Sequence, residues 1–232
     1  FGEKTQQNII DTIEYYLHNK GSYLYNQVEV VVPQIAAYLE KLFLPENVFI
    51  TGAFKRQLET IDELDFVVNS TNELIKPKFV SANPPELLEE KPDSLLYKLL
   101  NGLRLRLLTG TGNIAERLFK TSGSKEFVEA FVSNFPKTDF SKSSGTDDKA
   151  LFSQANISYI PVFARESATI IEKAKATSFT EVIQPGDIKG IIHSHSNWSD
   201  GSYTVEDMAN AAIEKGFEYL VLSDHSKSAF YA

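Results

Sequence analysis

Leucine and arginine alternate along residues 103–107, in the order Leu-Arg-Leu-Arg-Leu. Side chains of a β-strand point alternately to its two faces, so this run buries its leucines only if both arginines face the other side. The dipeptide Asn101-Gly102 before it is a strong hairpin turn signal, which indicates pairing with the apolar residues that precede it. The chain must therefore build a sheet with one apolar and one charged face.

The amino-acid composition excludes several classes of protein and of site. The chain has 232 residues, 42 % of them hydrophobic and 23 % charged, which is typical of one or two globular domains. The formal net charge of −8 means that any contact with DNA must come from a local patch. The absence of cysteine excludes disulfides, thiolate metal sites and cysteine nucleophiles. A metal would have to be held by His, Asp or Glu.

The ends of the sequence carry no targeting signal. No apolar run is long enough to span a membrane, and the start resembles no signal peptide, so we expect a cytoplasmic protein without a membrane partner. The sequence lacks an initiator Met and stops just after an apolar, strand-like run. These features predict a fragment of a longer protein.

Apolar spacing predicts the elements that precede and begin the sheet. Two helices are expected over residues 5–17 and 27–43, and Pro33 should either bend the second helix or mark its true start. Strands are expected at 48–50 and 64–68. A long turn over residues 52–62 should join them into a hairpin with charged residues at one end.

The second half of the chain contains two predicted connections and a change of pattern. Residues 136–148 and 166–186 are poor in apolar side chains and are expected to be loops or linkers. A strand at 188–195, a helix at 205–215 and a strand at 219–223 then predict one right-handed βαβ unit.

Three of the four histidines lie in this βαβ unit. His193 and His195 should share one face of the first strand, Asp200 follows in the loop, and His225 ends the next parallel strand. We expect the four side chains to converge at the carboxyl edge of the sheet, where imidazole and carboxylate groups could hold Zn, Mn or Fe. The alternative is two buried histidines with satisfied hydrogen bonds, a simple turn at Asp200-Gly201 and a surface His225.

The segment 188–228 resembles the opening of a PHP (polymerase and histidinol phosphatase) domain, in the form fused to bacterial family X DNA polymerases. The similar residues are Ile-His-Ser-His-Ser-Asn-Trp-Ser-Asp-Gly and Leu-Ser-Asp-His-Ser. The resemblance implies a distorted (β/α)7 barrel that binds several metal ions and hydrolyses phosphoesters, with 3′-5′ exonuclease activity in the polymerase fusion. By this resemblance His193, His195, Asp200 and His225 match metal-ligand positions, and the remaining ligands would lie beyond this chain.

The resemblance to family X polymerases extends backwards. It implies an α+β fold with a nucleotidyltransferase-like palm, helical fingers and thumb, and then the first βαβ unit of a PHP barrel. Its anchors are residues 52–56, 59–65, 101–103 and 122–126. The implied domains are the end of a helix-hairpin-helix region (1–20), the polymerase-like part (21–135), the thumb remainder and linker (136–186) and an incomplete PHP domain (187–232).

The resemblance also marks departures at the palm. Nucleotidyl transfer needs two carboxylates spaced by one residue, matched by Glu63 and Asp65, and a third on a neighbouring strand to hold two Mg²⁺ ions. The third position falls on Arg104 or Arg106, and residues 94–115 contain no Asp or Glu. A cation there would repel Mg²⁺. We therefore expect a degenerate palm, whose arginines could instead bind a DNA phosphate, a nucleotide or a structural anion.

The nucleotide-binding positions of the family are only partly kept. Gly52 and Arg56 match phosphate-binding residues, whereas Ala53 replaces a serine and Lys120-Thr121 replaces an aromatic pair.

Three functions follow as hypotheses. The first is a DNA-repair protein with a PHP phosphoesterase using Mn, Zn or Fe and an inactive palm. It would act on gapped, nicked or 3′ DNA ends and could bind a nucleotide. The second is an active gap-filling polymerase using Mg²⁺ at the palm. The third is a non-catalytic module that binds DNA ends or a protein partner.

Overall fold

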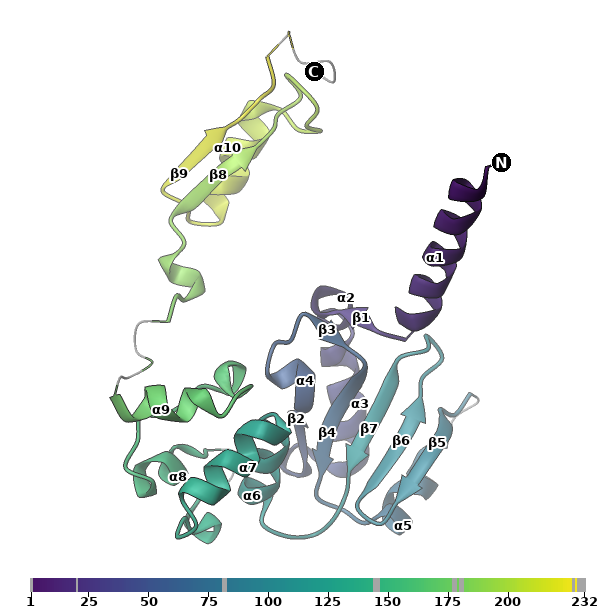
Figure 1. Cartoon of the computed structure of the whole chain (residues 1–232), viewed down its shortest axis with the longest axis vertical. Coiled ribbons are helices and arrows are strands. Elements are labelled where there is room, and N and C mark those ends of the chain that lie inside the picture. Colours follow the sequence, from purple (N-terminus) through teal and green to yellow (C-terminus); the bar gives the residue numbers. More distant parts are fainter. Residues whose placement is uncertain are drawn as a thin grey trace. The chain divides into compact units, whose positions relative to one another are not determined.

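The computed structural model describes residues 2–19, 21–80, 83–143, 147–176, 179, 182–226 and 228. The chain forms two compact units, Phe1–Phe179 and Thr180–Ala232 (Figure 1). Helices and strands alternate without a simple repeat, which confirms the predicted α+β class. Among the described residues, no helix has both the length and the apolar character needed to cross a membrane.

The first unit is built on a five-stranded sheet with the order β2-β4-β7-β6-β5. The pair β4–β7 is parallel, and the other neighbours are antiparallel. The predicted hairpins β2–β4 and β6–β7 are confirmed, and Gly102 turns the second one with φ +88°. The strands are β2 (Val48–Thr51), β4 (Glu63–Val68), β5 (Glu86–Lys91), β6 (Ser94–Lys98) and β7 (Arg104–Leu108).

The two faces of β7 differ as the alternation predicts. Leu105 and Leu107 are buried, whereas Arg104 and Arg106 lie half-buried on the opposite face. The apolar face packs against α2 (Tyr25–Glu29) and α3 (Val32–Phe43). Pro33 stands in the first turn of α3, so it marks the start of that helix and does not bend it.

The segment 52–62 is more ordered than the long turn that the sequence predicts. It contains the short helix α4 (Gly52–Lys55) and strand β3 (Thr60–Ile61), which pairs with β1 (Tyr23–Leu24). Gly52 makes the abrupt change from strand to helix possible because its φ of +68° is unfavourable for residues with a side chain. The first unit also contains the helices α1 (Glu3–Asn19) and α5 (Asn72–Ile75).

Four further helices form a second core, made largely of phenylalanines. They are α6 (Ile114–Thr121), α7 (Lys125–Asn134), α8 (Lys149–Gln154) and α9 (Thr169–Ala176). The side chains of Asn113 and Ser124 cap α6 and α7. Helix α9 lies inside 166–186, so the prediction of a plain connection there is wrong. The segment has few apolar residues, but two of them, Ile171 and Ala174, are buried in this core and hold the helix in place.

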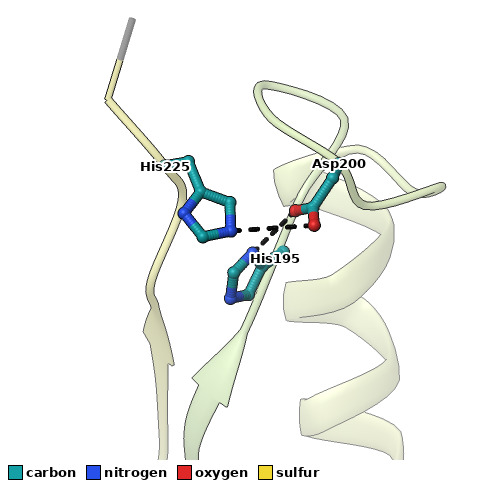
Figure 2. Close-up of side chains that lie close together, drawn as sticks. All are labelled: His195, Asp200 and His225. Carbon is teal, nitrogen blue, oxygen red and sulfur yellow. Dashed lines mark hydrogen bonds and ion pairs between the residues drawn. The ribbon is translucent and has the colours of Figure 1, made fainter. Parts of the chain in front are cut away.

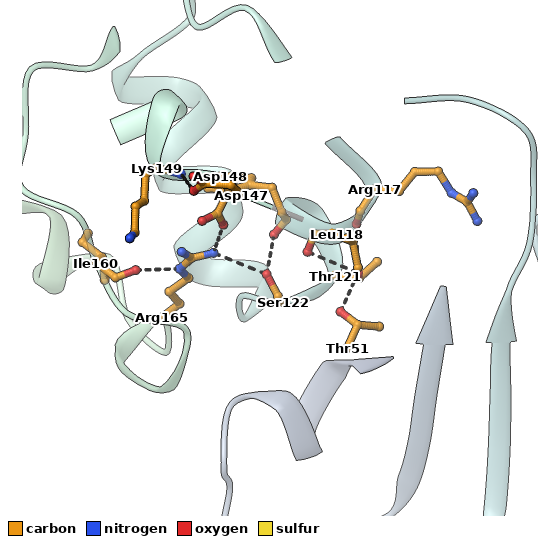
Figure 3. Close-up of polar contacts among 11 residues, drawn as sticks. Thr51, Arg117, Leu118, Thr121, Ser122, Asp147, Asp148, Lys149, Ile160 and Arg165 are labelled. Atoms are coloured by element: carbon orange, nitrogen blue, oxygen red, sulfur yellow. Dashed lines mark hydrogen bonds and ion pairs between the residues drawn. The ribbon is translucent and has the colours of Figure 1, made fainter. Parts of the chain in front are cut away.

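Arg165 is fully buried within the second core, and Figure 3 shows its polar contacts. Its guanidinium lies 4.9 Å from the ring centre of Phe152 and 5.5 Å from that of Tyr159. It donates to the carbonyl oxygen of Ile160 at 2.9 Å and pairs with Asp148 at 2.5 Å. The aromatic core is thus assembled around a cation that one carboxylate neutralises.

Arg117 joins α6 to the sheet. Its guanidinium donates to the carbonyl oxygens of Leu108 at 2.6 Å, Gly110 at 2.8 Å and Val68 at 3.2 Å. These carbonyls lie at the ends of β4 and β7 and just beyond β7, where the sheet ladder no longer supplies donors. One side chain therefore fixes the helical core to the two parallel strands.

The second unit consists of β8 (Gly190–Ser194), α10 (Val205–Glu214) and β9 (Tyr219–Leu222). The two strands are parallel, which confirms the predicted βαβ pattern. Thr204 and Asp207 form a capping box that begins α10. The 3-10 helices of the whole chain, over the described residues, are Pro45–Asn47, Lys76–Lys78, Phe140–Lys142, Val162–Ala164 and Pro185–Asp187.

Replacing Asp148 by Asn tests the buried ion pair. The change leaves the guanidinium of Arg165 buried without a counter-charge, so we expect the free energy of unfolding to fall by about 3 kcal/mol in urea denaturation. Glu129→Gln, which breaks the exposed pair with Lys125, is the control and should cost less than about 1 kcal/mol. Equal losses in the two variants would contradict this account.

Candidate functional site

The register of β4 and β7 decides which residues face the carboxylates of Glu63 and Asp65. Glu63 is paired with Arg104, and Asp65 is paired with Arg106. Directly paired residues of adjacent strands point to the same face of a sheet. Both arginines therefore stand beside the carboxylates, on the strand where the family resemblance led us to expect a third carboxylate.

Arg106 bridges two carboxylates. Its Nε donates to Oε2 of Glu63 at 2.6 Å, and a terminal nitrogen donates to Oε1 of Glu89 at 2.9 Å. The hydrogen bond to Glu63, followed by that to Glu89, holds the pKa of Arg106 above its ordinary value. Glu63 thus already has a fixed counter-ion. Nothing in the local pattern predicted the part played by Glu89, because β5 is separated from β7 by strand β6.

Arg104 is held less tightly. Its Nε donates to the carbonyl oxygen of Asp62 at 3.2 Å, and a terminal nitrogen lies 3.9 Å from Oε1 of Glu63. The side chain is 40 % exposed, twice as much as that of Arg106 at 20 %. Of the two arginines on this face, Arg104 is therefore the one more able to meet an anion from solution.

Asp65 is largely enclosed. Burial, together with repulsion from Glu63, raises the pKa of its carboxyl to about 7, although Arg106, Arg56 and the backbone N–H of Ala53 oppose the shift. A Cβ at Gly52 would overlap this carboxyl group. Residue 52 must therefore lack a side chain for both its positive φ and its contact with Asp65.

Arg56, which the resemblance assigns to phosphate binding, has an internal partner. Its Nε contacts Oε1 of Glu166 at 2.5 Å, and its side chain is only 13 % exposed. Ser124 donates to the backbone oxygen of Glu166 at 2.8 Å, which holds that segment in place. A phosphate could reach Arg56 only by competing with this carboxylate.

Three possible metal ligands come together where the loop after β8 meets the segment after β9 (Figure 2). Nδ1 of His195 lies 2.7 Å from Oδ1 of Asp200, and Nε2 of His225 lies 3.7 Å from Oδ2 of the same carboxylate. One ligand atom from each of the three residues lies within 4.8 Å of the others. The hydrogen bond with His195 holds the pKa of Asp200 below its ordinary value. Two imidazoles and a carboxylate form a donor set that suits Zn, Mn or Fe.

The placement of His193 differs from the expectation that all four residues converge. Its ring centre lies 5.2 Å from that of His195, whereas the rings of His195 and His225 are 4.5 Å apart. His193 is a neighbour of the three-residue cluster and is not a member of it. His193 belongs to β8, while His195 already lies in the following loop, where the strict alternation of a strand no longer applies.

Asp224 organises the loop, a role that the sequence analysis missed. Its carboxylate accepts hydrogen bonds from the backbone N–H of Ser196 at 2.7 Å and from the hydroxyls of Ser196 and Ser199 at 2.6 and 2.7 Å. These bonds hold the loop between His195 and Asp200. The position of Asp224 directly before His225 is the one sequence feature that could have indicated this role. Gly201 completes the turn, because a Cβ there would overlap the carbonyl of His195.

Comparisons with known proteins give a partial relationship. No family model matches the chain. Over 80 residues, which are 34 % of the chain, it is 36 % identical to the DNA polymerase/3′-5′ exonuclease PolX of Bacillus subtilis (strain 168). This stretch is 14 % of that protein, so the chain spans only a small part of the relative it matches. The predicted homology to a family X polymerase is confirmed for that stretch.

Among solved structures, Leishmania infantum polymerase beta in a ternary P/T complex is similar with a TM-score of 0.44 and 12 % identity. The similarity covers 66 % of this chain and 80 % of that one.

Replacing Asp65 by Asn tests how this buried carboxyl couples stability to pH. The pKa rises from about 3.9 in an unfolded chain to about 7 in the folded protein. The folded state therefore keeps a proton that the unfolded state releases, and stability falls as the pH rises through this window. We expect Asn to leave stability nearly unchanged near pH 4 and to increase it by up to about 4 kcal/mol near pH 8. Urea denaturation across this range would contradict the prediction if both proteins showed the same pH slope.

Replacing Asp224 by Asn tests the support of the ligand cluster. Asn cannot accept all three hydrogen bonds, so the loop should lose its fixed geometry and the affinity for Zn²⁺ should fall roughly 10- to 100-fold in calorimetric titration. Asp207→Asn, which weakens only the cap of α10, is the matched control and should leave the affinity unchanged. Equal affinities in the two variants would show that the carboxylate of Asp224 does not position the cluster.

Proposed function

We propose that this chain is part of a DNA-repair protein of the family X polymerase type that carries a PHP phosphoesterase and whose palm no longer synthesises DNA. The observation that carries the proposal is the gathering of His195, Asp200 and His225 within 4.8 Å. The 80 residues that match PolX, whose name includes both a polymerase and a 3′-5′ exonuclease, support the polymerase family and the nuclease activity in this proposal.

The donor chemistry of the cluster fits a divalent metal. His195 and His225 would supply imidazole nitrogens, and Asp200 would supply a carboxylate oxygen. A metal bound there would supply an activated water for attack on a phosphoester. The protein's own contribution is orientation. Asp224 fixes the loop through Ser196 and Ser199, so that the ligands need little rearrangement.

The ion pairs at the proposed palm argue against DNA synthesis, because the groups that would bind Mg²⁺ and phosphate already have internal partners. Glu63 is paired with Arg106, and a Mg²⁺ ion bound by Glu63 would lie next to that guanidinium. Arg56 is paired with Glu166, so the phosphate-binding cation is also occupied. These two internal ion pairs support an inactive palm over the alternative of a gap-filling polymerase.

A second candidate is a DNA-binding role for the palm without catalysis. Arg104 favours it, since its guanidinium is 40 % exposed and lies no closer than 3.9 Å to the carboxylate of Glu63. Such a role is compatible with phosphoesterase activity elsewhere in the same protein.

The deciding experiment measures exonuclease and primer-extension activities side by side, with Mn²⁺, in the longer protein that carries this chain. Wild-type protein should degrade DNA from the 3′ end and extend no primer. His195→Ala should lower degradation at least about 100-fold through loss of a ligand. Lys189→Ala, which removes only an exposed pair with Glu218, is the control. Extension by both wild type and His195→Ala would overturn the account of Arg106, and degradation unchanged in His195→Ala would overturn the metal site.

A further inference from the structure

Two exposed aromatic side chains lie on the loop that carries the ligand cluster. Trp198 is 82 % exposed and Tyr203 is 68 % exposed. The backbone around them is nevertheless held firmly. The N–H of Trp198 donates to the hydroxyl of Ser196 at 3.2 Å, and the N–H of Asn197 donates to the carbonyl oxygen of Tyr203 at 2.8 Å. The loop therefore presents an indole to solvent from a fixed position.

The position of Trp198 ties it to the cluster. It follows His195 by three residues and precedes Asp200 by two. Consecutive Cα atoms are about 3.8 Å apart, so the Cα of Trp198 lies within roughly 11 Å of that of His195 and within roughly 8 Å of that of Asp200. The hydroxyl of the adjacent Ser199 is bound to Asp224. Trp198 therefore belongs to the same short loop as two of the three possible ligands, His195 and Asp200.

The residue types around Trp198 indicate which kind of molecule would bind there. Residues 190–214 contain no Lys or Arg, so the loop offers no side-chain cation to a phosphate backbone. It offers aromatic faces, on which unpaired bases stack regardless of their identity. In a duplex the faces of internal bases are already covered by their neighbours.

We propose that the indole of Trp198, on the loop that also carries Tyr203, stacks on a nucleobase next to the phosphate held at the His195, Asp200 and His225 cluster. This inference rests on the proposed phosphoesterase function and deepens it. In this arrangement Trp198 binds an unpaired base, and the cluster binds the phosphate.

Trp198 is the single tryptophan of the chain, so its fluorescence reports on the site directly. The chain, kept free of metal with EDTA to prevent hydrolysis, is titrated with a single-stranded thymidine octamer. A matched octamer with abasic sugars carries the same charge without bases. We expect quenching by the thymidine octamer and none by the abasic one. Equal quenching by both, or by neither, would overturn the inference.

Variants separate stacking from mere proximity. Trp198→Phe keeps a flat ring and should bind a labelled octamer with an affinity within about threefold of wild type, whereas Trp198→Leu should lose at least about fivefold in fluorescence anisotropy. Ile213→Ser changes an apolar side chain on α10 that is 72 % exposed, and serves as the control. Equal losses in the Phe and Leu variants would contradict a stacking role.

Hydrolysis of bis(p-nitrophenyl) phosphate with Mn²⁺ by the longer protein tests the proposed function separately. Quenching without hydrolysis would mean that the base site exists but the phosphoesterase proposal is wrong. Hydrolysis without quenching would mean that the phosphoesterase proposal stands and the inference about Trp198 is wrong.

Discussion

The parallel pairing of β4 with β7 is the constraint on which the first unit depends. Leu105 and Leu107 must face the core, so both arginines of β7 are forced to the opposite side, directly beside Glu63 and Asp65. A guanidinium in this half-buried place needs counter-charges, which Glu63 and Glu89 provide. Burying the leucines thus determines the electrostatics of the other face.

Local patterns predicted much of this arrangement. Alternation and the Asn101-Gly102 turn were sufficient for the hairpin and for the two-sided character of β7, because both depend only on neighbouring residues. Partners that come from distant segments were not predictable. Glu89 reaches Arg106 across an intervening strand, and Asp148 reaches Arg165 from a segment whose composition indicated a linker.

In the ligand cluster, too, sequence patterns predicted part of the arrangement and missed contacts that depend on how a loop folds. The βαβ pattern brought His195, Asp200 and His225 together as expected, because parallel strands end at one edge of the sheet. The separate position of His193 and the supporting role of Asp224 depend on how the loop after β8 folds. Hydrogen bonds from Ser196 and Ser199 set that geometry, and periodicity carries no information about them.

The bridge from Glu63 through Arg106 to Glu89 also limits which residues position 106 can accept. An acidic residue at position 106 alone would leave Glu63, Asp65 and Glu89 around a new carboxylate, without the cation that now pairs with Glu63 and Glu89. The folded state of such a variant would depend on a bound metal from the outset. A carboxylate at position 106 therefore requires a coordinated change on β5 as well as on β7, so these two strands are coupled electrostatically although β6 lies between them.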